Sequence, residues 1–391
     1  MKIFINLFLL SLILASVFLS IKPMISYVQS NRMMASVFFA NSIESKDIKD
    51  KYNERDRVKV MIVPGHDKIN SGAVFDDIKE SDMNLRVGEY LFSYLNSNKK
   101  VDVTLSRDKN GYNKDLSKYL SNNMEEIREF YNSKKVIMKD LISEGKIFSN
   151  INVQHNSAPG RVVDTLYGIN KYVNDNKYDI VIHIHFNDYP GRVGKGGKYN
   201  GFSIYVPEKQ YSNAEATLDL ADSISNSLTN LFPKSNMPRE DSIVEDQELI
   251  AIGSYNTADP ASMLIEYGYI YERQFQDPEI KELIFNELAY QTYLGITDFF
   301  GDRTERRDFD FSNSHIFSSD LESGDSGRDV LALQALLKRN NVYPPYSNLN
   351  DCPISGYFGD CTEKSLILLQ KDNGVSPTGY FGGLSRDILA K

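Results

Sequence analysis

The chain has no tryptophan, and its 391 residues include only two cysteines and five histidines. Cys352 and Cys361 are too few ligands for a metal site built from cysteine alone. Without tryptophan, any sugar-binding surface lacks the strongest stacking residue. Because histidine is rare, two histidines at strand ends near acidic residues would suggest a functional site.

Strong positive charge is also missing. The formal net charge is −9, and no strongly basic stripe occurs along the chain, which argues against a nucleic-acid-binding protein. An acidic chain gains no general attraction to anionic lipids, so such binding would depend on local geometry. The hydrophobic content of 41% is ordinary for a globular protein, and the length allows two or three domains.

The N-terminus carries a long uncharged run from Ile3 to Ile21, flanked by Lys2 and Lys22. A membrane-spanning helix needs about 20 residues, whereas the apolar core of a signal peptide has roughly 7–15. For residues 1–22 we favour an uncleaved membrane anchor and keep a cleaved signal peptide as the alternative.

Both alternatives imply an exported protein of the cell envelope, either membrane-anchored or free in the periplasm or outside the cell. In such a compartment Cys352 and Cys361 are expected to form a disulfide. Contact with a membrane is expected only through an uncleaved N-terminal segment.

Composition and pattern divide the remaining chain. The highly charged residues 42–57 predict a solvated spacer or a short surface helix. We expect a spacer over residues 23–57, a first domain over 58–301, a linker over 302–322 and a small domain over 323–391.

The first domain alternates short β-type runs with longer helical ones, which predicts an α/β fold: a mostly parallel, open twisted sheet flanked by helices. The expected strands are Val58–Val63, Val101–Ser106, Ile180–Phe186, Phe202–Val206 and Met263–Glu266. The expected helices are Asp82–Asn96, Ser157–Asp175, Ala214–Phe232 and Pro278–Phe300.

A long polar segment, Lys109–Asn156, interrupts this alternation. Its apolar periodicity indicates helices packed on one edge of the domain. A lid over a functional site is the second interpretation.

The last 70 residues or so contain an internal repeat. Gly356-Tyr-Phe-Gly359 is echoed by Gly379-Tyr-Phe-Gly382, and Val330–Gln334 is echoed by Leu366–Gln370. The pattern predicts a small α-helical C-terminal domain with tight, glycine-dependent turns. Four tyrosines could either stack on sugar rings or complete a small core. They are Tyr343, Tyr346, Tyr357 and Tyr380.

Two histidines and two glutamates fall at or near the ends of the expected strands: His66, Glu80, His185 and Glu266. Ligands of open α/β sheets bind beyond the carboxyl ends of strands, so these residues can converge. Two imidazoles and one carboxylate can hold zinc with one position left for water, and a further carboxylate can handle protons.

The other histidines are weighed against this set. His183 and His185 share one face of a strand, so periodicity alone cannot choose between them; His185 is preferred because it lies nearer the strand end. His183 is then a core residue or supports the ligands. His155 and His315 lie in polar contexts and are expected to be solvated.

Five motifs in order resemble the amidase-3 family of zinc-dependent N-acetylmuramoyl-L-alanine amidases, over roughly Val58 to Phe300. They are Pro64-Gly65-His66, Glu80 before a helix, Leu105-Ser106-Arg107-Asp108, Ile184-His185-Phe186-Asn187 and Glu266-Tyr267-Gly268-Tyr269. From Ser323 onward the tail resembles a peptidoglycan-binding domain 1 module. The chain departs from the family at Asp67-Lys68 and at His183, and its insertion before Asn156 is longer.

The resemblance implies that His66, Glu80 and His185 bind Zn²⁺ and that Glu266 is the catalytic base and acid. The implied reaction is hydrolysis of the amide between the lactyl group of N-acetylmuramic acid and L-alanine in peptidoglycan. A zinc peptidase that cuts the stem peptide and a noncatalytic wall-binding protein are the alternatives. Whether an activator protein controls the site stays open.

Overall fold

The computed structural model describes residues 43–54, 56–149, 160–189, 192, 196–302, 315–346 and 348–389. The predicted anchor or signal at residues 1–22 lies outside this set, and so does His155. Within the described ranges, no helix has both the length and the apolar character needed to cross a membrane.

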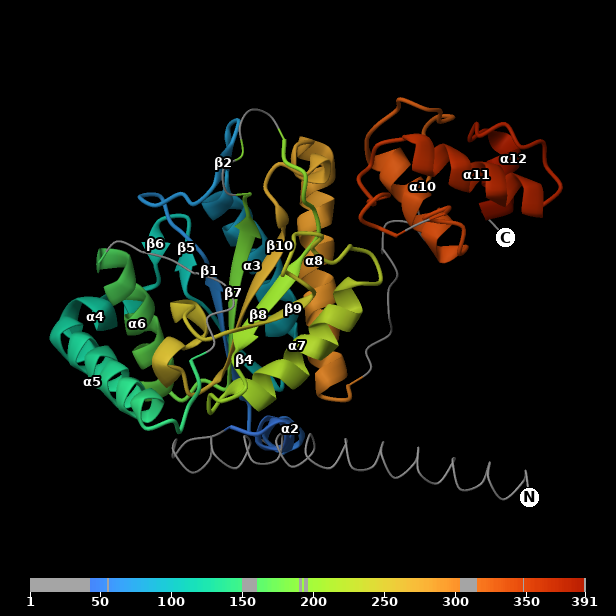
Figure 1. The fold of residues 1–391 in the computed structure, drawn as a ribbon. Coiled ribbons are helices and arrows are strands. Elements are labelled where there is room, and N and C mark those ends of the chain that lie inside the picture. Colours follow the sequence, from blue (N-terminus) through green and yellow to red (C-terminus); the bar gives the residue numbers. More distant parts are fainter. Residues whose placement is uncertain are drawn as a thin grey trace, which may run out of the picture.

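A six-stranded sheet forms the centre of the first domain, with its strands in the order β4-β1-β7-β10-β8-β9 (Figure 1). The first four strands run parallel, whereas β8 and β9 run parallel to each other and antiparallel to β10. Their bounds are β4 Val101–Leu105, β1 Val58–Pro64, β7 Ile180–Asn187, β10 Ala261–Tyr269, β8 Ser203–Pro207 and β9 Ile243–Asp246. The predicted mostly parallel sheet is confirmed.

Helices cover both faces of the sheet. Alternate side chains of β1, β7 and β10, such as Ile62, Ile182 and Ile265, are fully buried in the larger core, to which the helices α3 Glu80–Ser97, α7 Ala214–Leu228 and α8 Pro278–Phe299 contribute. The opposite side chains, such as Met61 and Val181, pack in a second core with α6 Gly160–Asp175. This alternation is expected when both faces of a strand are covered.

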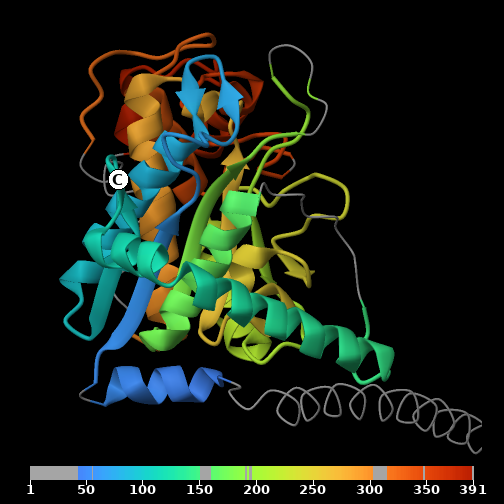
Figure 2. The ribbon, with the colours of Figure 1, turned by 90° about the vertical axis from the view of Figure 1, so that its left-hand side faces the viewer.

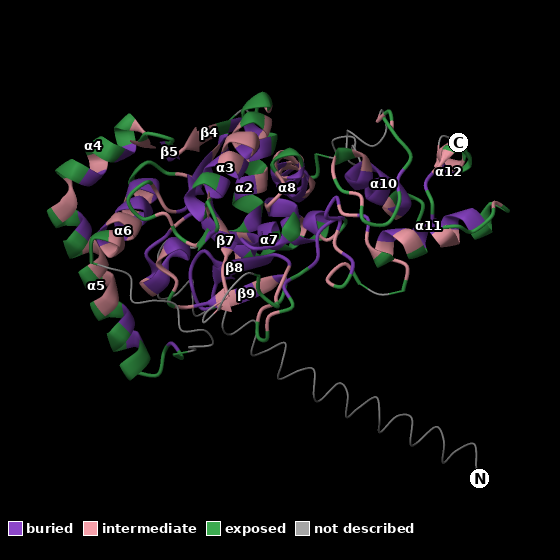
Figure 3. Cartoon of the chain, turned by 90° about the horizontal axis from the view of Figure 1, so that it is seen from above, coloured by how far each residue is buried: buried purple, intermediate pink, exposed green. Residues whose placement is uncertain are grey.

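The insertion forms two helices, α4 Lys114–Asn122 and α5 Met124–Ser143. Leu116, Leu120 and Ile127 pack with α6 in the second core, while Met138 and Leu141 pack against Tyr211. The outer face of α5 is exposed (Figure 3). As far as residues 114–149 show, the segment is a helical insertion packed on the domain, as the first interpretation predicted.

The charged segment before the sheet is more structured than a solvated spacer. Helix α2, Ser45–Asn53, buries Ile48 and Tyr52, each 1% exposed, and the ring of Tyr52 stacks on Phe300. The second alternative, a short surface helix, is therefore correct. Two large side chains four positions apart, Ile48 and Tyr52, give this mostly charged helix one buried face.

Short elements complete the domain. Two hairpins, β2 Val74–Phe75 with β3 Ile78–Lys79 and β5 Arg107–Asp108 with β6 Gly111–Tyr112, follow strands β1 and β4. Three 3₁₀ helices, η1 Ile250–Ile252, η2 Ser254–Asn256 and η3 Arg273–Phe275, lie near β10 in the chain. Figure 2 shows that the β2–β3 hairpin and α2 lie at opposite ends of the sheet.

The C-terminal domain contains α10 Arg328–Arg339, α11 Asp360–Asp372 and α12 Gly383–Leu389, beside α8 (Figure 1). The amide of Gln334 donates to the Tyr357 carbonyl and accepts from the Gly356 N–H. Gln370 makes the same two contacts with Tyr380 and Gly379. The sequence repeat is thus a structural repeat in which one buried glutamine closes each Gly-Tyr-Phe-Gly turn.

Two predictions about this region have clear outcomes. Cys352 and Cys361 form the predicted disulfide, with their Cα atoms 5.7 Å apart. The expectation that His315 is solvated is wrong: its Nε2 lies 2.7 Å from Asp329 Oδ1 and its ring packs edge-on against Phe317. The carboxylate of Asp329 in α10 and the ring of Phe317, two residues further along the chain, are partners of His315 that the polar sequence around it does not reveal.

Candidate metal centre and active site

Three of the four predicted site residues meet at the carboxyl edge of the sheet. His66 follows β1, His185 is near the end of β7, and Glu80 is the first residue of α3. Glu80 Oε1 lies 2.9 Å from His185 Nδ1, and its Oε2 lies 3.1 Å from His66 Nε2. One ligand atom from each residue lies within 4.8 Å of the other two. The convergence that parallel strands make possible is realised in the structure.

Two glycines make room for this cluster. A Cβ at Gly65 would lie 2.1 Å from His185 Nε2, and a Cβ at Gly72 would lie 2.3 Å from Glu80 Oε2. Gly72 also has φ of +71°, which favours glycine. His66 itself has φ of +60°, an uncommon conformation for a residue with a side chain. The backbone is thus shaped so that the imidazole reaches the carboxylate.

Arg107 and Asn84 fix the loop that carries His66. The buried Arg107 guanidinium donates to the carbonyls of Pro64, Gly65 and Ser81 at 2.8–2.9 Å. Asn84 Nδ2 donates to the same Gly65 carbonyl at 3.0 Å. The sequence resemblance pointed to Arg107, but only the fold reveals Asn84, because it lies one turn after Glu80 on α3.

Glu80 is prepared to stay ionised. Burial of this side chain, 4% exposed, opposes its negative charge, but hydrogen bonds from His185 and His66 outweigh burial and hold the pKa of the Glu80 carboxyl below its usual value. The backbone N–H of Ala73 also donates to Oε2 at 2.9 Å. Burial in turn lowers the pKa of His185, which keeps its imidazole neutral. A neutral imidazole beside a carboxylate is the form in which both can bind a cation.

Glu266 lies next to this cluster in opposite surroundings. It pairs directly with His185 in the register of β10 and β7, so the two side chains leave the same face of the sheet. Its Oε2 is buried without a hydrogen-bond partner among the described residues. Burial, together with the carboxylates of Glu80 and Glu240, raises the pKa of the Glu266 carboxyl well above its usual value.

Glu240 was not anticipated from the sequence. Its carboxylate accepts hydrogen bonds from the hydroxyls of Tyr205, Ser235 and Tyr269 at 2.7–2.9 Å. These three donors hold a second negative charge near Glu266. Glu240 lies in a polar loop between α7 and β9, and nothing in the local sequence Met-Pro-Arg-Glu-Asp distinguishes this segment from an ordinary solvated loop.

His183 lies outside the donor cluster. It is 1% exposed, and burial, reinforced by the neighbouring His185, lowers its pKa to about 3. A hydrogen bond with the backbone of Ala251 holds the ring. His183 lies two residues further from the end of β7 than His185 does. It therefore contacts η1, which contains Ala251, and does not reach the edge of the sheet where the donor cluster lies.

The donor set fits a zinc ion. Four ligands placed tetrahedrally at 2.0–2.1 Å lie about 3.3 Å from one another, and the two nitrogen–oxygen separations here are 2.9 and 3.1 Å. Three protein ligands would leave one coordination position, as in catalytic zinc sites. His66 is 31% exposed at its side chain, so the cluster is open on that side.

The sequence profile of the amidase-3 family, described as N-acetylmuramoyl-L-alanine amidase, matches residues 60–298, more than half of the chain. The chain belongs to the amidase-3 family. A second profile, a peptidoglycan-binding domain, matches residues 326–389. No curated protein sequence matches the chain significantly.

Several solved structures of amidases are similar to parts of this chain at low sequence identity. The amidase AmiC2 of Nostoc punctiforme is 17% identical, with 62% of this chain and 97% of that chain covered and a TM-score of 0.39. The CwlD amidase of Clostridioides difficile, in complex with the GerS lipoprotein, is 17% identical, with 63% and 99% covered and a TM-score of 0.40. Membership in the family depends on the sequence profile and not on these similarities.

The amidase-3 assignment has direct consequences. The protein is a peptidoglycan amidase that acts at the cell wall, and its second profile match agrees with peptidoglycan as the substrate. Of the three functions considered from the sequence, the family match supports the amidase over the peptidase and the noncatalytic protein.

Proposed function

We propose that this amidase is zinc-dependent, with His66, Glu80 and His185 as the ligands and Glu266 as the catalytic base and acid. The observation that carries the proposal is the convergence of the three donor side chains beside Glu266, whose Oε2 is buried with no hydrogen-bond partner among the described residues. In the described part of the chain, no other group of three or more His, Cys, Asp or Glu side chains is arranged to hold a metal.

A zinc ion in this position supplies a Lewis acid that activates water at neutral pH. Glu266 accepts a proton from the attacking water, and its raised pKa lets it retain that proton until the amide breaks. It then donates the proton to the nitrogen of L-alanine, because an unprotonated amine is a poor leaving group. Glu240 fixes the charge beside Glu266, and Arg107 fixes the loop of His66.

The domain boundaries remain predictions: a catalytic domain over residues 58–301, a linker over 302–322 and a peptidoglycan-binding module over 323–391. Profile matches at residues 60–298 and 326–389 support this division. We also propose that residues 1–22 export the chain, either as an uncleaved anchor or as a cleaved signal.

Mass spectrometry of purified muropeptides digested by the protein tests the function. We expect free stem peptides that begin with L-alanine, lost with a chelator and restored by zinc. Cleavage inside the stem peptide would show that the protein is a peptidase and not an amidase. Unchanged hydrolysis in the presence of the chelator would show that the reaction does not depend on a metal.

A further inference from the structure

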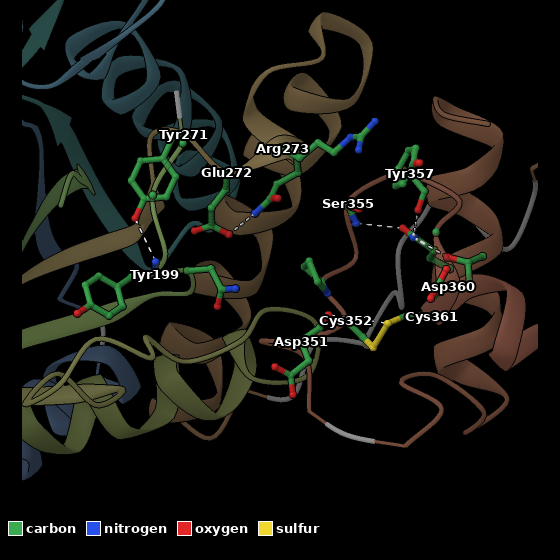
Figure 4. A pocket seen from close by; sticks show the side chains of 18 of the residues that line it. Tyr199, Tyr271, Glu272, Arg273, Asp351, Cys352, Ser355, Tyr357, Asp360 and Cys361 are labelled. Atoms are coloured by element: carbon green, nitrogen blue, oxygen red, sulfur yellow. Dashed lines mark hydrogen bonds between the residues drawn. A yellow bond between two sulfur atoms is a disulfide. The ribbon is translucent and has the colours of Figure 1, made fainter. Parts of the chain in front are cut away.

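A cleft of about 490 Å³ separates the catalytic domain from the C-terminal module, and each domain supplies one wall (Figure 4). The catalytic wall includes Tyr199, Tyr271 and Arg273, whereas the module wall includes Tyr357 and Asp360. The volume falls within the roughly 300–1,000 Å³ that small-ligand sites occupy. Nothing in the amidase reaction described above uses this cleft.

The two walls are fastened to each other. Asn350 Nδ2 donates to Asn200 Oδ1 at 2.8 Å and to the Lys234 carbonyl at 2.6 Å, and Asn200 Nδ2 donates back to the Asn350 carbonyl at 2.8 Å. The guanidinium of Arg273 lies 3.4 Å from the centre of the Tyr357 ring. These contacts join the domains at the rim of the cleft, so its walls form one preformed surface.

The lining favours a neutral, hydroxyl-rich ligand. The exposed cations Lys198 and Arg273 are balanced by the exposed carboxylates of Asp351 and Asp360. A third carboxyl group of the lining, Glu272, is buried, and burial raises its pKa to about 7, so the cleft carries at most a small excess of negative charge with which to select an ion. Tyrosine rings offer an apolar face with a polar edge, which suits the apolar face and the hydroxyl groups of a sugar.

The cleft also lies near the catalytic edge. Tyr271 follows β10 two residues after its end, and its ring lies 6.4 Å from the ring of Phe75, in the hairpin that follows the His66 loop. Both domains therefore meet at the end of the sheet where the His66–Glu80–His185 cluster is located. A sugar chain seated in the cleft could continue towards that cluster.

We infer that the cleft is a composite binding site for the amino-sugar backbone of peptidoglycan, completed only when both walls are present. The inference rests on the proposed function, because the bound strand has to present a muramic acid to the catalytic edge. The module would then set the position of the glycan relative to the site, in addition to holding the enzyme on the wall.

The test uses the full chain and a neutral amino-sugar probe, triacetylchitotriose, in calorimetric titrations. We expect Tyr199→Ala and Tyr357→Ala, one from each wall, to weaken binding by about two- to tenfold. Tyr357→Phe should bind as the parent does, because it keeps the ring. Tyr380→Ala is the matched control: Tyr380 has the same position in the second repeat but lies outside the cleft lining.

Three outcomes would overturn the inference: no binding of the probe, unchanged binding in both alanine variants, or equal weakening in Tyr380→Ala. Weakening by Tyr357→Ala alone would also overturn it, since the site would then belong to the module. Hydrolysis of a soluble muramoyl peptide by the parent protein reports the proposed function separately. Absence of this hydrolysis would contradict the proposed amidase function. Absence of probe binding in a protein that hydrolyses the muramoyl peptide would contradict only the proposed binding site in the cleft.

Discussion

The start of α3 and the end of β10 each place a glutamate at the same edge of the sheet, yet the two carboxylates meet opposite surroundings. Glu80 accepts hydrogen bonds from two imidazoles and a backbone N–H, which favour its ionised form. Burial of Glu266 Oε2 and two nearby carboxylates increase the affinity of Glu266 for a proton. Nearby donors and charges, and not the residue type, prepare one glutamate to bind a cation and the other to carry a proton.

Removal of the charge at Glu80 should have the largest effect. We expect Glu80→Gln to lose both the metal and hydrolysis, because a neutral amide is a weak ligand between two imidazoles. Metal content by mass spectrometry and stem-peptide release are the measurements. Glu89→Gln, on the more exposed part of the same helix, should change neither. A Glu80→Gln protein that keeps stoichiometric metal would show that the ligand is wrongly assigned.

Removal of the charge at Glu266 should affect hydrolysis but not metal binding. We expect Glu266→Gln to lose about 10²- to 10⁴-fold in kcat, the usual contribution of a general base and acid, while the metal content stays unchanged. The same two assays measure this. Full activity in the variant would rule out the proton-transfer role.

Glu272 sharpens the comparison, because its buried carboxylate has backbone donors at Gly201 and Tyr269. Burial outweighs these donors and raises its pKa from 4.5 to about 7. The folded protein therefore holds a proton on Glu272 that the unfolded chain releases, so the contribution of Glu272 to stability is most favourable below pH 4.5 and becomes less favourable up to about pH 7.

Glu272→Gln should lack this dependence. The free energy of unfolding of the variant, relative to that of the parent, should rise by on the order of 3 kcal/mol between pH 4.5 and 8. Urea unfolding at each pH measures this difference. Parallel stability curves for the two proteins would show that Glu272 ionises normally in the fold.

Glu240 should give the smallest effect. Its negative charge helps to raise the pKa of Glu266, so Glu240→Gln should move the acid limb of the kcat/KM profile to lower pH. We expect a change of a few-fold in kcat at neutral pH. Movement of the acid limb to higher pH would contradict the proposed electrostatic coupling.

Much of the site could be predicted from the sequence because strand ends and motif order carry the information. His66, Glu80, His185 and Glu266 lie on elements whose apolar patterns are clear, and the parallel sheet brings the ends together. The choice between His183 and His185 depended on depth along β7, and the structure places the latter in the cluster.

The remaining features depend on tertiary contacts. Strand β9 is a four-residue edge strand, Ile-Val-Glu-Asp, too short and polar to identify from its pattern. Glu240 gains its surroundings from two tyrosines on β8 and β10, and the cleft wall at Tyr357 exists only because the two domains pack together. No local pattern encodes such contacts between distant segments.

Helix α2 has a consequence for orientation. It is anchored by Ile48 and Tyr52 at the end of the sheet opposite the β2–β3 hairpin and the His66 loop (Figure 2). Any tether that acts through the residues before Ile43 would therefore hold the enzyme at the end of the sheet opposite the catalytic edge. The catalytic edge would then face outward, towards a polymer that lies on the far side of the molecule from its point of attachment.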